Sequence, residues 1–292
     1  MTFVAGPVTV RTPASSANLG PGFDALGLAL TLYDEITAEV TDTPGLDIEV
    51  SGEGALDVPR TSDHLVVTAM TATFDLLGER PTGLRLECVN AIPHGRGLGS
   101  SAAAIVGGIM LARALVEGSA SRLDDRAAFQ LAVDLEGHPD NVAAAMFGGL
   151  TIAWIDGAAA EVERLDTAVE VTAFVPPEAV STEKARGLLP ETVPHRDAAV
   201  NAGRAALLVA ALTTAPERLI WATEDRIHQT YRADAMPESY KLLRQLRVEG
   251  IPTIISGAGP TVLSFARGLA DRAPEGWTVH ELDVDTEGAH TL

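Results

Sequence analysis

Hydrophobic and polar residues alternate along several short segments of the chain, which is typical of strands with one buried face. In residues 36–40, isoleucine, alanine and valine alternate with polar side chains, and residues 46–50 repeat this pattern. Short apolar runs of similar length predict further strands. The strands predicted in these two ways are residues 8–11, 36–40, 46–50, 84–89, 150–155, 171–175, 251–255, 261–265 and 277–284.

Other segments place apolar residues every three or four positions, the spacing of one helix face. Residues 63–77 show this spacing clearly, and an alanine-rich segment that begins at Ser101 ends at Gly118, as helices commonly do. Ser121 and Asp124 resemble a capping box for the next helix. The predicted helices are residues 63–77, 101–116, 124–135, 142–147, 181–190, 196–213, 216–228 and 237–248.

The order of these elements predicts the fold class. Strands and helices are mixed without strict alternation, which favours an α+β architecture in two lobes over a doubly wound sheet. A chain of 292 residues is long enough for two domains of moderate size. Residues 156–166 are acidic and small and have no strong periodicity. We therefore expect an N-terminal domain at 1–160 and a C-terminal domain at 161–292.

The charge and the cysteine content limit the possible partners and location. With 40 acidic and 21 basic residues, the formal net charge is -19, and such a surface repels nucleic acid and anionic membranes. A single cysteine, Cys88, cannot form a disulfide framework. The N-terminus lacks a signal-peptide pattern, and no apolar run approaches the roughly 20 residues that span a bilayer. We expect a cytoplasmic protein with no nucleic acid or membrane partner.

Glycines at alternate positions, Gly95, Gly97 and Gly99, follow a predicted strand, and Ser100 and Ser101 then open a predicted helix. Residues without a Cβ let backbone N–H groups converge on an anion, and a helix start adds partial positive charge. This glycine loop has the outline of a phosphate site, although a tight turn without a ligand fits equally well. A Walker loop is excluded because no lysine lies nearby, and the dinucleotide-binding spacing fails because Ser100 replaces its third glycine.

Three segments resemble the motifs of one enzyme superfamily. Residues 93–103 are similar to the central ATP-binding motif of the GHMP kinases, residues 13–24 to the first motif, and residues 256–261 to the third. These motifs occur in the right order and their spacing fills the chain. Within the superfamily, residues 16–24 (Ser-Ala-Asn-Leu-Gly-Pro-Gly-Phe-Asp) and 136–141 (Glu-Gly-His-Pro-Asp-Asn) resemble those of homoserine kinases.

The resemblance implies a two-lobed α+β GHMP kinase fold, with an N-terminal lobe like ribosomal protein S5 domain 2 and a ferredoxin-like C-terminal lobe. It implies ATP-dependent phosphorylation of the L-homoserine hydroxyl to O-phospho-L-homoserine, in threonine biosynthesis, by a homodimer. Two alternatives stay open: a kinase for another small alcohol such as mevalonate, and a catalytically silent protein that senses ATP or an amino acid. The second is disfavoured because the sequence retains every residue expected to act.

By the same resemblance, ATP is expected on the glycine loop, with Mg²⁺ held by Ser101 and Glu136 against its β- and γ-phosphates. Hydroxyl and carboxylate oxygens suit this hard ion, which keeps several waters. Without the resemblance, Ser101 reads as a helix cap and Glu136 as a solvated helix end. The residues expected to bind ATP are Pro93, His94, Gly95, Arg96, Gly97, Leu98, Gly99, Ser100, Ser101, Ala102 and Ala103.

The resemblance also implies a homoserine site. Arg186 and Arg232 match a clamp for the substrate carboxylate, because a guanidinium group meets a carboxylate with two parallel hydrogen bonds. Asp24 matches an acceptor for the ammonium group. The residues expected to bind homoserine are Asn18, Asp24, His138, Asn141, Arg186 and Arg232, of which Asn18, Asn141 and Arg186 are also expected to act in catalysis.

Simpler explanations exist for these residues, because most arginines form surface ion pairs and a lone histidine is usually structural. His138 and Asp140 have no third ligand that would make them a metal site. Mevalonate kinase-like relatives place an aspartate in the region of Asn141, whose amide cannot act as a base. We therefore expect direct in-line attack by the hydroxyl, oriented by Asn18 and Asn141, with its proton leaving to phosphate or water.

Overall fold

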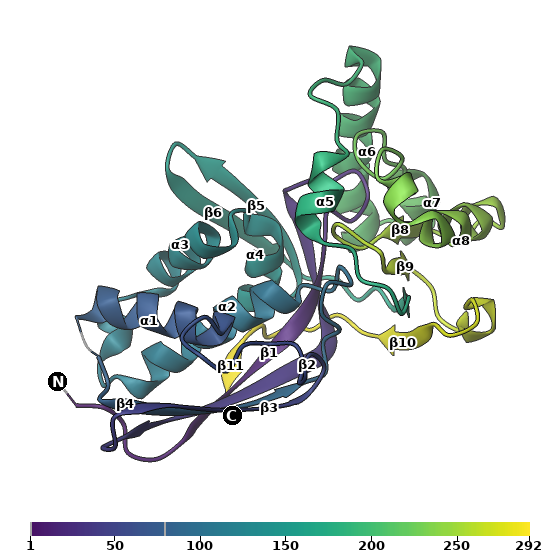
Figure 1. Ribbon diagram of the computed structural model, residues 1–292. Coiled ribbons are helices and arrows are strands. Elements are labelled where there is room, and N and C mark those ends of the chain that lie inside the picture. The colour runs from purple at the N-terminus through teal and green to yellow at the C-terminus, as the bar shows by residue number, and fades with distance from the viewer. Residues whose placement is uncertain (1, 79) are drawn as a thin grey trace.

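The computed structural model describes residues 2–78 and 80–292 and has two lobes, each built on its own β-sheet (Figure 1). The predicted α+β architecture in two lobes is confirmed. The strands are β1 (Val8–Ala17), β2 (Leu26–Thr41), β3 (Gly45–Gly52), β4 (Gly83–Asn90), β5 (Leu150–Asp156), β6 (Ala159–Leu165), β7 (Val171–Val175), β8 (Thr253–Ile255), β9 (Val262–Ser264), β10 (Thr278–Leu282) and β11 (His290–Thr291). The α-helices are α1 (Leu65–Leu77), α2 (Ser100–Leu115), α3 (Asp125–Glu136), α4 (Pro139–Phe147), α5 (Thr182–Gly187), α6 (His195–Thr213), α7 (Leu219–Ala222) and α8 (Pro237–Val248).

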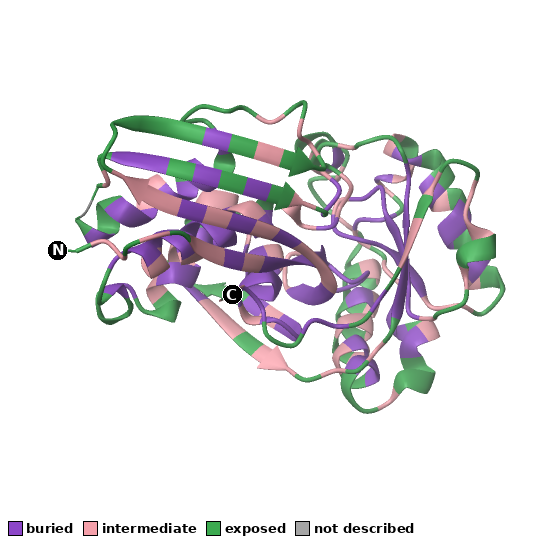
Figure 2. Ribbon diagram, turned by 90° about the horizontal axis from the view of Figure 1, so that it is seen from below, coloured by how far each residue is buried: buried purple, intermediate pink, exposed green. Residues whose placement is uncertain are grey.

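The first lobe consists of the larger sheet and helices α1–α4. Its strands run in the order β11-β1-β2-β4-β3, and the β5–β6 hairpin extends from β2. Burial alternates along several of these strands because one face of the sheet is packed and the other faces solvent (Figure 2). The four helices cover the packed face, where Met70, Leu86 and Ile105 share one hydrophobic core (Figure 1).

The second lobe places helices on both faces of a four-stranded antiparallel sheet with the order β10-β7-β9-β8. On one face, Leu208 and Leu212 of α6 join a core that continues into the first lobe at Leu28 and Leu98. On the other face, α8 packs against Phe174 of β7. This shared core fixes the two lobes against each other along the seam where the glycine loop lies.

Most predicted elements are confirmed, with α1, α2 and α8 within two residues of their predicted bounds. The first strand was predicted too short: β1 continues to Ala17, because its second half pairs with β2 after a register shift at Pro13. Such a shift in the ladder tolerates a proline, whose nitrogen has no hydrogen to donate.

Several helix bounds differ from the prediction: α4 begins at Pro139 instead of Val142, and α5 ends at Gly187 instead of Pro190. Asp124 alone caps α3, since its carboxylate accepts the N–H of Ala127 at 2.8 Å, and the capping box with Ser121 does not form. Only Leu219–Ala222 of the segment 216–228 is α-helical. The carboxylate of Asp225 accepts three of the next backbone N–H groups, which turns the chain away from the helix.

The acidic stretch predicted to separate two domains forms a strand instead of a linker. It contains β6, which pairs with β5 along its whole length and forms part of the first sheet. At the other end of the sequence, β11 also joins the first sheet, beside β1. The first sheet therefore takes residues from both sides of position 160, and the division into 1–160 and 161–292 stays a prediction.

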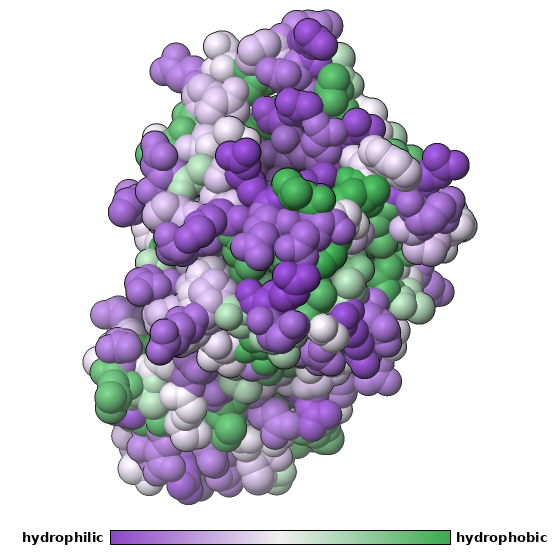
Figure 3. Space-filling model, turned by 90° about the vertical axis from the view of Figure 1, so that its right-hand side faces the viewer, coloured by the Kyte–Doolittle hydropathy of each residue, from purple (hydrophilic) through white to green (hydrophobic). Residues whose placement is uncertain are grey.

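The surface on the side of the second lobe is mixed. Hydrophilic side chains predominate on this face, and hydrophobic residues gather near its middle (Figure 3). Among the described residues, no helix is both long and apolar enough to cross a membrane.

Candidate active site

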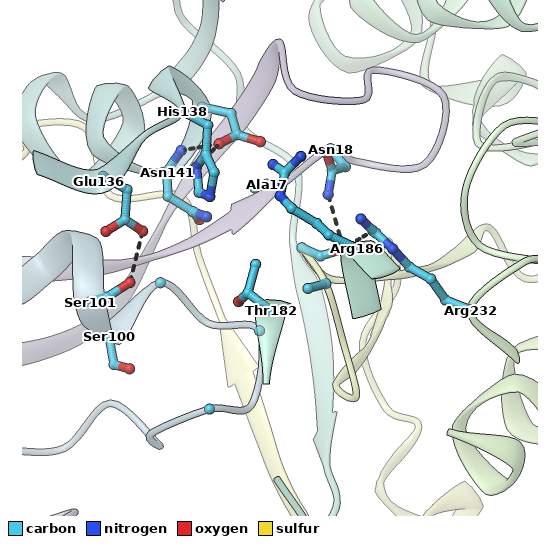
Figure 4. Close-up of a pocket in the computed structure, with 16 residues that line it drawn as sticks. Ala17, Asn18, Ser100, Ser101, Glu136, His138, Asn141, Thr182, Arg186 and Arg232 are labelled. Atoms are coloured by element: carbon cyan, nitrogen blue, oxygen red, sulfur yellow. Dashed lines mark hydrogen bonds and ion pairs between the residues drawn. The ribbon is translucent and has the colours of Figure 1, made fainter. Parts of the chain in front are cut away.

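A cavity of about 210 Å³ opens between the two lobes (Figure 4). Ser101 and Glu136 lie at one end of it and Arg186 and Arg232 at the other, so that hydroxyl and carboxylate oxygens are separated from the guanidinium groups. The predicted site residues that line it are Asn18, Gly95, Gly97, Gly99, Ser100, Ser101, Glu136, His138, Asn141, Arg186 and Arg232. The fold thus brings most of the predicted residues together, from the first two motifs, the segment 136–141 and two arginines of the second lobe.

The backbone of the glycine loop is oriented for an anion. The carbonyl groups of Gly95, Arg96 and Leu98 accept hydrogen bonds of 3.0 to 3.1 Å from N–H groups elsewhere in the chain. The carbonyl of Gly97 accepts one of 2.6 Å from Ser256 Oγ. In contrast, the N–H groups of residues 95–101 donate no hydrogen bond to any residue that the structure describes. These donors, together with the start of α2, form a ready site for phosphate oxygens.

Packing explains why two positions in the loop require glycine. Gly97 and Gly99 have φ of 77° and 72°, in the left-handed region that other residues rarely adopt. A Cβ at Gly97 would overlap the carbonyl oxygen of Ser256, and one at Gly99 would overlap Ser15 Oγ. The loop is therefore pressed between the first and third motifs, and its glycines allow that close approach.

At the oxygen-rich end of the cavity, Ser101 Oγ donates a hydrogen bond of 2.7 Å to Glu136 Oε1. Ser101 lies in the first turn of α2, and Glu136 is the last residue of α3. Burial raises the pKa of Glu136. Across residues 2–78 and 80–292, no three His, Cys, Asp or Glu side chains form a metal cluster. The hydroxyl and carboxylate suit Mg²⁺ only if phosphate oxygens and waters supply its remaining ligands.

Asn18 is fixed at the centre of the seam. Its φ is 65°, and Leu19 and Asp24 also have positive φ, at 48° and 55°. Such values are uncommon outside glycine and indicate backbone strain that the surrounding structure maintains. Asn18 Oδ1 accepts the N–H of Asp24 at 2.9 Å, and Nδ2 donates to the carbonyl of Gly257 at 2.9 Å. The side chain thus connects the first motif to the C-terminal glycine turn.

Asn141 and His138 lie at the start of α4. Asn141 Oδ1 accepts a hydrogen bond of 2.9 Å from Ser15 Oγ, which leaves Nδ2 to face the cavity (Figure 4). His138 Nδ1 lies 3.2 Å from Asp140 Oδ1, without the alignment of a hydrogen bond. The Asp140 carboxylate raises the pKa of His138, which favours a charged imidazole beside the cavity.

The two predicted clamp arginines differ in their surroundings. Arg186 forms a two-pronged ion pair with Asp24, with nitrogen–oxygen distances of 2.6 and 3.1 Å, and this partner raises the pKa of Arg186. Arg232 is only 2% exposed, and burial lowers its pKa. Both guanidinium groups lie over the ring of Phe23, at 5.7 and 5.3 Å from its centre.

Other predicted site residues do not line this cavity. Arg96 turns away from it and donates to the carbonyl of Pro176 at 3.2 Å, which ties the glycine loop to the second lobe. His94 lines a neighbouring cavity instead. Membership of a motif therefore did not distinguish residues that line the cavity from residues that shape the loop. The predicted residues outside the first cavity are Asp24, Pro93, His94, Arg96, Leu98, Ala102 and Ala103.

Several residues of the first cavity were not predicted from the sequence. Asp140 was considered only as half of a metal pair, although it lines the cavity and is almost fully buried. Thr182 begins α5, directly after the cap residue Ser181, and that cap was the only local signal for its position. The lining residues that were not predicted are Ala17, Asp140, Thr182, Gly257 and Ala258.

A second cavity of about 270 Å³ adjoins the first at Ser100 and Ser101. Apolar side chains such as Val66 line much of it, and His64 Nδ1 is buried there without a partner among the described residues. Asp34 also lines it, and burial raises the pKa of Asp34 to about 6. This cavity was not predicted from the sequence, because most of its lining comes from separate segments outside the three motifs.

Comparison with known proteins agrees with this geometry. The family described as "GHMP kinases N terminal domain" matches residues 64–149. A homoserine kinase of Streptomyces avermitilis is 56% identical over 99% of this chain and 97% of its own length, and one of Streptomyces coelicolor is 54% identical over 99% and 96%. The crystal structure of homoserine kinase from Cytophaga hutchinsonii has the same fold, with a TM-score of 0.85 at 24% identity over 100% of this chain and 99% of that one.

Proposed function

The chain belongs to the homoserine kinases of the GHMP kinase family, which use ATP to phosphorylate the hydroxyl of L-homoserine, and we propose that the cavity between its lobes is the active site. One observation carries this proposal: unpaired backbone N–H groups, a hydroxyl–carboxylate pair and two guanidinium groups share a single cavity. Phosphoryl transfer depends mainly on positioning and on neutralising negative charge, and these groups supply both.

ATP fits the two adjoining cavities. The N–H groups of residues 95–101 are free to bind its phosphates, and Ser100 and Ser101 border both cavities. The apolar second cavity then receives the nucleoside, where the unpartnered Nδ1 of His64 can accept a hydrogen bond from the base. This arrangement directs the γ-phosphate toward Asn141 and the arginines.

Ser101 and Glu136 are the residues that would hold Mg²⁺. Their oxygens are 2.7 Å apart at the phosphate end of the cavity, and both are hard ligands. The ion, when bound, would neutralise charge on the phosphates. Burial raises the pKa of Glu136, and a bound cation would offset this cost of burying its charge.

Homoserine fits the opposite end of the cavity. Its carboxylate and ammonium groups are attached to the same carbon atom, so a complementary site needs a cation and an anion side by side. Arg186, which lines the cavity, and Asp24, which lies behind it outside the lining, have this arrangement, since they form an ion pair of 2.6 Å. Arg232 is the second cation beside them. The hydroxyl then extends toward Asn18 and Asn141.

The attack needs no side-chain base in this arrangement. Asn141 offers only an amide, and Asp140, one of the two carboxylates that line the cavity, already accepts the N–H of Asn141 at 2.9 Å. Asp140→Asn should therefore keep kcat within about tenfold of wild type across a pH–rate profile, because a true base contributes roughly 10²- to 10⁴-fold. A larger loss, accompanied by the disappearance of an ionisation near neutral pH, would identify Asp140 as the base.

Arginine substitutions test the site as a whole. Arg186→Ala or Arg232→Ala should raise the KM for homoserine roughly 100-fold, because each removes a charged partner, and should leave the KM for ATP within about twofold. Arg218→Ala, at an exposed ion pair, is the matched control. An unchanged KM for homoserine in both active-site variants would mean that homoserine binds elsewhere.

The proposal also covers the location of the protein in the cell, its oligomeric state and its domain boundary. The buried thiol of Cys88, the single cysteine of the chain, supports a cytoplasmic location. The net charge of -19 supports small-molecule substrates over nucleic acid. We retain the homodimer, which the resemblance to the family implies, and the boundary near residue 160.

A further inference from the structure

A buried histidine lies directly behind Arg232, outside the cavity. His228 is fully buried, with Nε2 2.6 Å from the carbonyl oxygen of Gly20 and Nδ1 3.1 Å from Arg232 Nη1. A carbonyl oxygen requires a donor and a guanidinium nitrogen requires an acceptor. Both contacts are satisfied only by the neutral ring with its proton on Nε2, which donates to Gly20 while Nδ1 accepts from Arg232.

The surroundings favour this neutral ring. Burial lowers the pKa of His228, and the charge of Arg232 acts in the same direction. The carboxylate of Asp225 lies 3.6 Å from Nε2 and opposes them. Its oxygens, however, already accept the backbone N–H groups of residues 227–229. Asp225 therefore shapes the turn that presents His228 and leaves the Nε2 proton to Gly20.

Arg232 is held on several sides by these contacts. Its Nε donates to the carbonyl of Ala185 at 3.2 Å, and Nη1 is used by His228. The ring of Phe23 lies 5.2 Å from the His228 ring and 5.3 Å from the guanidinium carbon. The hydrogen bonds of Arg232 to described residues use only Nε and Nη1, so Nη2 remains for a ligand in the cavity (Figure 4).

We propose that His228 is a positioning residue for substrate binding, which fixes the guanidinium of Arg232 in the orientation that clamps the homoserine carboxylate. The two ring nitrogens have separate tasks: Nδ1 orients Arg232, and Nε2 anchors the first motif at Gly20. The inference rests on the proposed function, in which Arg232 binds the substrate carboxylate.

Two substitutions separate the tasks of the ring nitrogens. In His228→Asn, the amide oxygen takes the place of Nδ1 and can still accept from Arg232. In His228→Gln, the amide nitrogen takes the place of Nε2 and can still donate to Gly20, but the acceptor for Arg232 is lost. We expect His228→Gln to raise the KM for homoserine roughly 10- to 100-fold at unchanged KM for ATP, and His228→Asn to raise it less than about threefold. His195→Gln, at an exposed histidine that begins α6, should change neither.

A truncated substrate shows whether the loss concerns the carboxylate. The alcohol 3-amino-1-propanol is homoserine without that group. In His228→Gln, kcat/KM for homoserine relative to kcat/KM for this alcohol should therefore fall by the same factor as the KM for homoserine rises. Equal losses in the two His228 variants, or parallel increases in both KM values, would show a merely structural role. If Arg232→Ala itself left the KM for homoserine unchanged, the proposed function would fail, and the inference with it.

Nitrogen NMR of the wild-type imidazole tests the inference without a variant. The ring of His228 should be neutral, with its proton on Nε2 and a hydrogen-bonded Nδ1. Homoserine should shift the Nδ1 signal, because its carboxylate binds Arg232, which donates to Nδ1. A non-hydrolysable ATP analogue should not shift this signal. A charged ring, a proton on Nδ1, or equal shifts with both ligands would overturn the proposal.

Discussion

At the scale of single residues, Glu136 tests the proposed Mg²⁺ site, in which its carboxylate would be a ligand. Glu136→Gln preserves the shape of the side chain and an acceptor for Ser101, but it removes the negative charge. We expect the Mg²⁺ concentration for half-maximal activity to rise roughly tenfold or more, with an unchanged KM for homoserine. Activity measured against free Mg²⁺ at fixed ATP checks this.

The control for that substitution lies on the same helix. Asp134→Asn removes a carboxylate from the exposed side of α3 and should leave the Mg²⁺ requirement unchanged. A Glu136→Gln enzyme with reduced kcat but a normal Mg²⁺ requirement would contradict the assignment of Glu136 as a ligand.

At the scale of elements, the glycine loop depends on its contact with the C-terminal turn. Gly97 and Gly250 have similar φ, 77° and 82°, so alanine costs about 1 kcal/mol of backbone strain at either position. A Cβ at Gly97 meets the backbone oxygens of Ser256 and Gly259, whereas one at Gly250 meets nothing within 4 Å. Gly97→Ala should therefore destabilise the protein by about 1 to 3 kcal/mol more than Gly250→Ala.

Urea unfolding measures the difference in stability between Gly97→Ala and Gly250→Ala. The KM for ATP shows how each substitution affects the glycine loop. We expect the KM for ATP to rise in Gly97→Ala and to stay unchanged in Gly250→Ala, because the strained loop cannot keep its N–H groups in place. Equal stability of the two variants would mean that the turn at Ser256 moves aside without cost.

At the scale of the whole molecule, Asp34 makes stability depend on pH. This carboxylate on β2 accepts the N–H groups of Ala91 and Ile92, at 2.7 and 2.9 Å, just before the glycine loop. Burial raises its pKa from 3.8 to about 6, so between these values the folded protein binds more protons than the unfolded chain. The contribution of Asp34 to stability is thus fully present below pH 3.8 and is lost as the pH rises through about 6.

Asp34→Asn removes this titration. The free energy of unfolding of wild type relative to the variant should decrease by up to about 3 kcal/mol between pH 4 and pH 7, because a shift of one pKa unit corresponds to about 1.4 kcal/mol. Urea unfolding of both proteins across this range checks the prediction. A difference that stays constant with pH would show that Asp34 titrates normally in the folded protein.

The sequence was sufficient for much of the fold because local patterns reflect local forces. The spacing of apolar residues predicted α1 and α8, and the glycine loop was found from its composition alone. The prediction of a helix at 216–228 was wrong where a side chain intervened, since Asp225 accepts the N–H groups that would have continued the helix. The strand β6 was missed because partial burial along its length leaves no clear alternation.

The sequence by itself determined most of the elements and the three motifs, because each depends on residues that are neighbours along the chain. Only the tertiary structure decided which side chains meet. Arg96 and Arg232 were both predicted as site residues, yet Arg96 donates to the carbonyl of Pro176 and only Arg232 lines the cavity. Asn18 bonds the carbonyl of Gly257, 239 residues away. Such contacts follow from the packing of two lobes against a shared core, and no local pattern records that packing.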